Sequence, residues 1–224
     1  MNVKLISHSQ APQDTLPYPS KYHRKELYDS STLDLIAFCA RVSNPNNQNN
    51  TKTSEKLVKY LMKHKHWSPL EMVSACLEIE TTRDIARQIL RHRSFSFQEF
   101  SQRYADPIKD LSFVRRGARL QDPDNRQNSI EAASQVVQDH WDMKQQEVIK
   151  KAREVYTWAI ENGIAKEQAR AVLPEGNTVT RLYVNGTLRS WVHYIELRKE
   201  NGTQREHMNI AMEVAKVIAQ IFPL

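Results

Sequence analysis

Apolar and polar residues repeat along the chain with two different periods, which separate the expected strands from the expected helices. Between residues 72 and 80 they alternate, so that Val73, Leu77 and Ile79 fall on one face and Glu78 falls on the other. This period of two predicts a half-buried strand. Composition and pattern give the remaining expectations, which are strands at 2–8, 110–120 and 178–185 and an extended segment at 94–105.

Helical spacing, with apolar residues three or four positions apart, covers most of the rest of the chain. Ser31 and Asp34 fit a capping box at the start of one helix, and Thr81 and Asp84 fit a second one. Pro174 is expected to stop a short helix, because proline cannot continue one. The expected helices cover 32–42, 54–64, about 130–162, 166–173, 187–197, a segment from Arg83 that buries Ile85, Ile89 and Leu90, and a C-terminal segment through Met208 and Phe222.

The chain shows no internal repeat and no linker-like segment, so we expect a single domain over residues 1–224. Its 40% of hydrophobic and 26% of charged residues are typical of a globular protein with a full core. The fold class that these elements predict is α+β, mostly helical around a central antiparallel or mixed sheet.

Neither a membrane span nor a signal peptide is expected. No run of about 18 apolar residues exists, and the first residues lack the apolar core of a signal peptide. The expected location is therefore cytoplasmic, in a bacterium or in the cytosol of a virus-infected host. Cys39 and Cys76 lie in apolar surroundings and are expected to be reduced, buried and unreactive, since no base adjoins either of them.

The net charge of +6 suits nucleic acid, and it suits equally an enzyme whose ligands carry phosphates or carboxylates. Only five glycines occur, and neither a G-x-G-x-x-G nor a P-loop motif is present. A dinucleotide would therefore have to be held by side chains. His64, His66 and His92 match no common zinc spacing, and no metal is expected.

Arginines are concentrated between residues 83 and 104. Arg83, Arg87 and Arg91 are spaced to share one helical face, where each like-charged pair costs roughly 0.2–0.5 kcal/mol. Arg93 and Arg103 add two more guanidinium groups. Such crowding is typical of an anion site, because arginine forks suit phosphate. A solvated basic face remains the other interpretation of charge alone.

The order of residues in this segment is more specific than its charge. Arg91-His92-Arg93, seven intervening residues and Ser101 form an RHR-x7-S pattern. This pattern resembles the signature of the flavin-dependent thymidylate synthases, and the resemblance covers most of the chain. Further similarity lies at Gln88, Glu99, Arg103, Tyr104, in the block Arg170-Ala-Val-Leu-Pro174, and in the block from Thr187 through Arg189 and His193 to Arg198. Many members carry Asn where Thr187 and His193 stand.

The resemblance implies a set of site residues, each carried over by its position in these motifs. The FAD contacts that it implies are His66, Ser68, Arg91, His92, Arg93, Glu99, Thr187, Arg189 and His193. The dUMP contacts that it implies are Gln88, Arg91, Glu99, Ser101, Gln102, Arg103, Arg170 and Arg198. Arg198 matches the arginine thought to act on the uracil ring, so it is the implied catalytic residue. Gln204 and Glu206 resemble the last motif of the family without an assigned role.

The resemblance also implies a reaction and an assembly. A member of this family is a methyltransferase that converts dUMP to dTMP. Methylenetetrahydrofolate supplies the carbon, FAD carries the hydride and NADPH reduces the flavin. Members form homotetramers with shared active sites, and neither a membrane nor a nucleic-acid partner is implied.

A second hypothesis rests on the residues alone. Arginines interleaved with Phe95, Phe97, Phe100 and Tyr104 are a pattern found in basic proteins that bind single-stranded nucleic acid, where aromatic rings stack on bases. A flavoprotein of another reaction class is a third possibility. Bound flavin, or its absence, would separate the first hypothesis from the second.

Overall fold

The computed structural model describes residues 2–11, 31–131, 134–200 and 202–223. Its centre is a four-stranded sheet in the order β1-β2-β6-β3, in which all neighbours are antiparallel. The strands are β1 (Asn2–His8), β2 (Ser74–Thr82), β6 (Val179–Thr187) and β3 (Ser96–Glu99). The predicted strands at 2–8, 72–80 and 178–185 are confirmed. Among the described helices, none is long and apolar enough to cross a membrane.

The sheet has one buried and one half-exposed face, as the alternation predicted. Ala75, Leu77 and Ile79 are at most 1% exposed and belong to the main core. On the other face Glu78 accepts a hydrogen bond from the Tyr183 hydroxyl on the paired strand at 2.9 Å. Burial of the apolar row fixes the register, because a slip of one residue would turn that row toward solvent.

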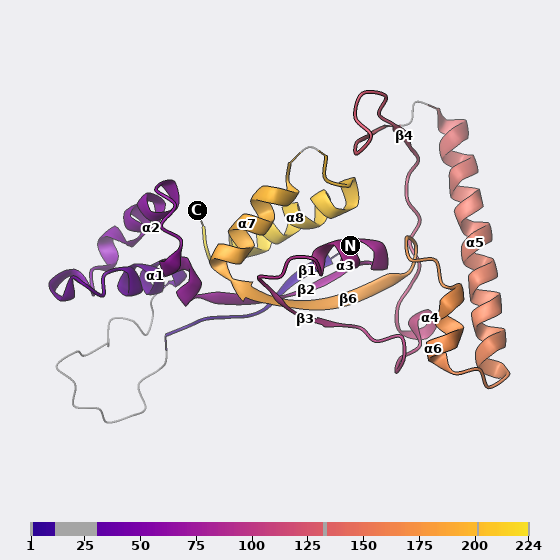
Figure 1. Ribbon diagram of the computed structural model, residues 1–224, viewed down its shortest axis with the longest axis horizontal. Helices are drawn as coiled ribbons and strands as arrows, with labels where there is room; N and C mark the ends of the chain where they lie inside the picture. The colour runs from indigo at the N-terminus through magenta and orange to yellow at the C-terminus, as the bar shows by residue number, and fades with distance from the viewer. Residues whose placement is uncertain (1, 12–30, 132–133, 201, 224) are drawn as a thin grey trace.

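Two helices, α7 (Leu188–Arg198) and α8 (Arg205–Ile218), cover the buried face. They contribute Trp191, Tyr194 and Val214 to the core, and the Trp191 indole donates to the Ala75 carbonyl at 3.0 Å. Helices α1 (Thr32–Ala40) and α2 (Ser54–Lys63) pack together at one end, and the capping box of Ser31 and Asp34 is present. Figure 1 shows α1 and α2 on the opposite side of the sheet from α5 (Gln135–Glu161).

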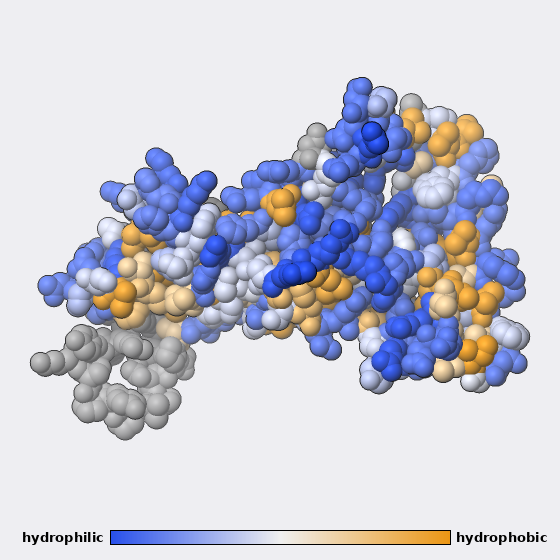
Figure 2. All heavy atoms as spheres, viewed as in Figure 1, coloured by the Kyte–Doolittle hydropathy of each residue, from blue (hydrophilic) through white to orange (hydrophobic). Residues whose placement is uncertain are grey.

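Helix α5 stands at the edge of the molecule with a second, smaller core at its C-terminal end. That core contains Tyr156, Ala159, Ala169 and Leu173, and it lies beside the short helices α6 (Lys166–Ala169) and α4 (Pro107–Asp110). Along the rest of α5, apolar side chains remain exposed, and Figure 2 shows apolar residues along this edge. They include Val136, Trp141, Val148 and Trp158, which are 61%, 45%, 51% and 57% exposed.

The expectation of strands through 110–120 is largely wrong. Only Arg119–Gln121 forms a strand, β4, paired with β5 (Ser129–Glu131). The segment before it is extended, but its backbone groups bond to glutamines of α5. The Gln145 amide bonds to the N–H and the carbonyl of Arg116, and Gln138 does the same for Ala118. Side chains thus replace the partner strand.

Two helix boundaries also differ from the prediction. Helix α5 begins at Gln135 rather than near 130, because residues 129–131 pair with β4. Thr81 is paired inside β2, and Thr82 is the N-cap of α3 (Arg83–Ile89), without a side-chain capping bond. The predicted capping box of Thr81 and Asp84 is therefore wrong. Helix α3 also ends before Arg91, so Arg91 does not continue a helical row of arginines.

Candidate functional site

Arg198, the last residue of α7, contacts the turn that follows α3. Its Nε donates to Nε2 of His92 at 2.9 Å, and the two residues are 106 positions apart in sequence. This contact joins the RHR motif to the block that ends at Arg198. The bond requires a free lone pair on His92 Nε2, so the ring must be neutral.

Burial and the nearby Arg198 charge lower the pKa of His92 to about 4. The ring is thus neutral at pH 7 and carries its proton on Nδ1. Aromatic neighbours hold it, since the rings of Tyr194 and Phe95 lie 5.0 and 6.4 Å away, both nearly perpendicular to it. The backbone N–H of Phe95 also donates to the His92 carbonyl at 3.2 Å, which closes the turn.

The Phe95 ring packs so closely against the backbone of Gly186 that any side chain at position 186 would collide with it. A Cβ at Gly186 on β6 would lie 2.6 Å from Cε1 of the Phe95 ring and still closer to Cδ1. Phe95 is 8% exposed and packs 4.5 Å from Trp191. The RHR turn is therefore anchored in the core, and Phe95 has no face free for a nucleobase.

A second group of predicted residues lies between the end of β3 and α6. The Arg103 Nε is 3.3 Å from a carboxylate oxygen of Glu167, and Arg170 Nε donates to the Glu167 carbonyl at 3.3 Å. Ser101 Oγ accepts from the Arg103 backbone N–H at 3.4 Å. This group, Ser101, Arg103 and Arg170, presents two guanidinium groups and a hydroxyl, the donors that a phosphate requires.

Glu99 and Gln102 flank this group. Glu99 Oε1 is 3.3 Å from Arg83 Nη1 and accepts from the Thr180 hydroxyl at 3.0 Å. Gln102 is only 3% exposed, and its Nε2 is buried without a hydrogen-bond partner in the described part of the chain. Arg87 forms a bidentate ion pair with Glu175, which accounts for its charge without a ligand.

A third group of predicted residues surrounds the start of α7. Thr187 is the N-cap of this helix and accepts from the Ser190 N–H at 3.3 Å. Arg189 forms an ion pair with Glu71 of the 3₁₀ helix Ser68–Met72. The His193 ring lies 4.6 Å from Trp67 in an edge-to-face contact, and exposed His66 and Ser68 flank Trp67. Trp67, which the sequence analysis missed, therefore belongs to this group.

Within the described part of one chain, the second and third groups lie at opposite ends of β6. Arg170 precedes β6 and Arg189 follows it, and a nine-residue strand spans roughly 30 Å. Helix α7 folds back over the sheet by only about 16 Å, so Arg198 stops short of the α6 end. Arg91 and Arg93 are exposed and have no ion pair among the described residues.

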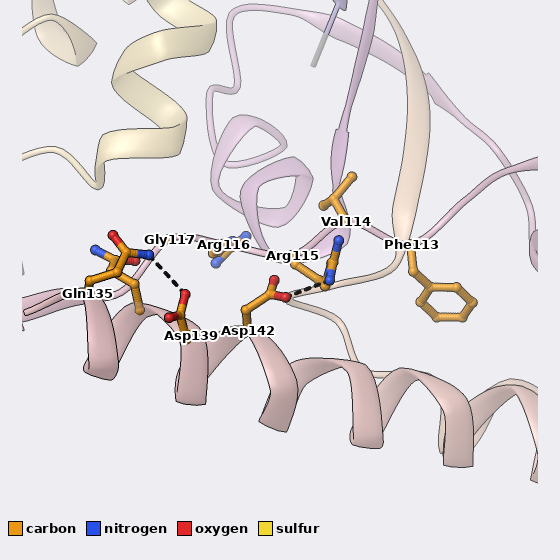
Figure 3. Close-up of a pocket in the computed structure, with 9 residues that line it drawn as sticks. Phe113, Val114, Arg115, Arg116, Gly117, Gln135, Asp139 and Asp142 are labelled. Atoms are coloured by element: carbon orange, nitrogen blue, oxygen red, sulfur yellow. Dashed lines mark hydrogen bonds and ion pairs between the residues drawn. The ribbon is translucent and has the colours of Figure 1, made fainter.

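Two cavities open along the segment from Phe113 to the β4-β5 hairpin. One of about 600 Å³ opens between the β4-β5 hairpin and the start of α8, lined among others by Arg119, Arg126, Gln204 and Arg205. The other, of about 550 Å³, lies between residues 113–117 and α5 (Figure 3). Arg115 pairs there with Asp142 at 2.7 Å, and Asp139 accepts a hydrogen bond from the Gln135 amide at 2.9 Å. None of the predicted FAD or dUMP contacts lines either cavity.

Comparison with known proteins identifies the family to which this chain is similar. The sequence profile of the family described as thymidylate synthase complementing protein matches residues 26–224. A probable flavin-dependent thymidylate synthase of Paramecium bursaria Chlorella virus 1 is 49% identical over 190 residues, which cover 85% of this chain and 87% of the relative. The flavin-dependent thymidylate synthase of Synechocystis sp. is 48% identical over 189 residues, 84% of this chain and 85% of the relative.

Solved structures share the fold. The crystal structure of a UMP/dUMP methylase, PolB from Streptomyces cacaoi, bound with 5-Br dUMP, superposes with a TM-score of 0.77. It covers 98% of this chain and 90% of its own, at 24% sequence identity. The predicted class, a mixture of helices around an antiparallel sheet, agrees with this neighbour.

Proposed function

The chain belongs to the family of flavin-dependent thymidylate synthases, and we propose that it converts dUMP to dTMP at a site assembled from more than one copy. It is a methyltransferase with FAD as cofactor, and residues 1–224 act as one synthase domain. The observation that carries the proposal is the bond from Arg198 to His92, which joins two motifs of the family by a contact that needs a neutral histidine.

The residues present fit a flavin. Arg91 and Arg93 offer guanidinium donors that no described carboxylate occupies, suited to a pyrophosphate. Trp67 and His193 offer flat surfaces beside Arg189, suited to a ring system. When bound and reduced by NADPH, FAD supplies the hydride that completes the methyl group.

Nucleotide binding follows from the second group. Arg103, Arg170 and Ser101 hold the phosphate of dUMP by charge-assisted hydrogen bonds. Glu99 is held by Arg83 and Thr180, so its second oxygen is free to accept from a sugar hydroxyl.

Arg198 is the residue that activates the pyrimidine. Carbon 5 of uracil is a poor nucleophile, and it becomes richer in electrons when negative charge is drawn toward N3 and O4. A guanidinium beside those atoms stabilises that charge. The bond to His92 leaves the two Nη groups of Arg198 to face the base. Cys76 is not activated, because burial raises the pKa of its thiol.

A homotetramer with shared active sites is the assembly that we propose. Two features support it. The phosphate-binding group and the α7 groups lie at opposite ends of β6 in one chain, and α5 exposes a row of apolar side chains that a second copy would cover. Methylenetetrahydrofolate and NADPH are the co-substrates that this reaction requires.

Two measurements test the function itself. The purified protein should show the visible absorption of flavin. With NADPH and methylenetetrahydrofolate it should release tritium from dUMP labelled at carbon 5. Arg198→Ala should retain the flavin absorption and lose most tritium release. Near-normal turnover in that variant would remove Arg198 from the proposed role.

Mixing of inactive variants tests the shared site. Arg198→Ala and Arg170→Ala subunits, unfolded and refolded together, should recover roughly a quarter of wild-type activity if each site takes Arg198 from one chain and Arg170 from another. Arg103→Ala mixed with Arg170→Ala is the matched control. These two residues belong to the same group, so their mixture should stay inactive. Recovery in neither mixture would show that one chain supplies both groups.

A further inference from the structure

Behind the Arg198–His92 pair, a chain of partly and fully buried hydrogen bonds links four elements of the fold. It starts at an ion pair, where Arg119 Nη2 of β4 donates to Glu206 Oε1 of α8 at 2.6 Å. Gln204 Nε2 donates to the other Glu206 oxygen at 3.0 Å. Gln88 Nε2 of α3 then donates to Gln204 Oε1 at 2.7 Å.

The chain continues to two fully buried rings. Nδ1 of His207 lies 3.1 Å from Gln88 Oε1, and Nε2 of His207 lies 3.1 Å from the Tyr194 hydroxyl. His207 is 0% and Tyr194 is 1% exposed. The His207 ring is 6.4 Å from the His92 ring, and Tyr194 touches both. These two rings therefore form the wall behind His92 and Gln88.

The charge of Glu206 fixes the direction of every bond in the chain. Burial would raise the pKa of this carboxyl, but the hydrogen bond from Arg119 and further hydrogen bonds lower it overall, so Glu206 is ionised and can only accept. Gln204 must turn its amide nitrogen to Glu206 and its oxygen to Gln88. Gln88 in turn must turn its oxygen to His207.

His207 is left with a single arrangement of its proton. Burial first, and then the charges of Arg198, His92 and Arg91, lower its pKa to about 3, so the ring is neutral. Its Nδ1 carries the hydrogen that Gln88 accepts, and its Nε2 accepts from Tyr194. A neutral, fully paired ring satisfies the requirement that buried polar groups be hydrogen-bonded.

We propose that His207 is a positioning residue for the nucleotide: its Nδ1–H and the chain behind it hold the Gln88 carboxamide in one orientation. Gln88 then presents one amide hydrogen and one carbonyl lone pair outward, and it cannot exchange them. This rests on the proposed function and on the contact between Gln88 and dUMP that the family resemblance implies. It also gives Gln204 and Glu206 a role, as the residues that set the polarity of the chain.

Two substitutions of His207 separate positioning from general support of the fold. His207→Asn places an amide N–H near the position of Nδ1, so the bond to Gln88 is retained and the bond to Tyr194 is lost. His207→Gln places its amide oxygen near the position of Nε2, so the bond to Tyr194 is retained and Gln88 loses its donor. Each variant removes the ring and keeps one of its two bonds, so similar losses of thermal stability are expected.

The affinity for dUMP should differ between them. In the flavin-loaded enzyme, His207→Gln should raise the KM and the calorimetric Kd for dUMP about five- to tenfold, the effect of one hydrogen bond, with little change in kcat. His207→Asn should keep both values within about twofold of wild type. Equal increases in the two variants would overturn the proposal, because a purely structural role predicts no difference between them.

The proton arrangement gives a readout that does not depend on catalysis. Nuclear magnetic resonance of the holoenzyme labelled with ¹⁵N-histidine should show His207 neutral and protonated at Nδ1. Glu206→Gln can donate as well as accept, so the chain can reverse and the Nε2–H form should appear. Glu213→Gln, an exposed position on the same helix, should leave the signal unchanged.

These outcomes separate the positioning role of His207 from the proposed synthase function. A wild-type His207 that is charged, or protonated at Nε2, overturns the positioning role even if dTMP is formed. Loss of dTMP formation in the wild-type protein would refute the proposed function and leave the proton arrangement to be judged on its own.

Discussion

Gly186→Ala is expected to destabilise the protein and to weaken flavin binding, although Gly186 is not itself a predicted ligand contact. The added Cβ would lie 2.6 Å from Phe95 Cε1, inside the 3.0 Å that real Cβ contacts respect. Phe95 has no room to retreat, because Trp191 lies 4.5 Å behind it. Overpacking of this kind costs roughly 1–3 kcal/mol. The displaced Phe95 would also carry the RHR turn with it, since its N–H closes that turn on the His92 carbonyl.

Urea unfolding and the flavin absorption per chain measure the two effects. Gly176→Ala is the matched control, because its nearest neighbour is the end of the Arg116 side chain at 3.8 Å and its Cβ has space. Phe95→Leu relieves the clash. In a double-mutant cycle with Gly186→Ala it should show a favourable coupling of about 1 kcal/mol or more. Equal stability of the two alanine variants, or no coupling, would refute the argument that the close approach anchors the turn.

Three further predictions concern the buried polar groups of the chain. His92→Phe keeps a ring but offers Arg198 no acceptor, so dTMP formation per bound flavin should fall roughly 10- to 100-fold in single-turnover assays, the effect of a hydrogen bond to a charged group. Gln145→Leu leaves the Arg116 backbone without its partners and should lower the free energy of unfolding by about 1–3 kcal/mol, whereas Gln146→Leu, exposed on the same helix, should have little effect. The pKa of His207 is lowered to about 3 in the folded protein, so below about pH 6.5 the unfolded chain binds a proton that the folded protein does not. The free energy of unfolding, measured by urea titration, should therefore fall by roughly 1 kcal/mol per pH unit as the pH is lowered from about 6.5. The free energy of unfolding of His207→Asn should depend less on pH.

The elements that depend on local pattern were predictable, and those that depend on distant partners were not. Strand β2 was predictable because the residues adjacent to Leu77 and Ile79 alternate between apolar and polar, and this alternation indicates which side chains are buried. The β4-β5 hairpin has three mostly exposed residues on each side and no apolar alternation to reveal it. The extended segment before it depends on Gln138 and Gln145 of α5, which follow their partners Ala118 and Arg116 by 20 and 29 residues, and no period in the sequence indicates these bonds.

The candidate site divides in the same way. The RHR-x7-S motif led to Arg91, His92 and Ser101, but it could not show that His92 is neutral, since that follows from burial and from an arginine 106 positions away. His207 gave no signal at all. A histidine inside an amphipathic helix is ordinary, and its partner Gln88 is 119 positions away.

The length of β6 is the structural reason for proposing that a second copy completes the predicted site. Antiparallel pairing with β2 along all nine residues makes β6 a straight spacer, so the phosphate-binding group and the start of α7 cannot approach each other without breaking the centre of the sheet. Reorientation of Arg103 or Arg189 side chains recovers only a few ångströms of roughly 30. Closing the site between chains leaves the sheet intact and covers the apolar row on α5 in the same step. In the proposed assembly, the strand that keeps the groups apart within a chain would also make their relative position reproducible.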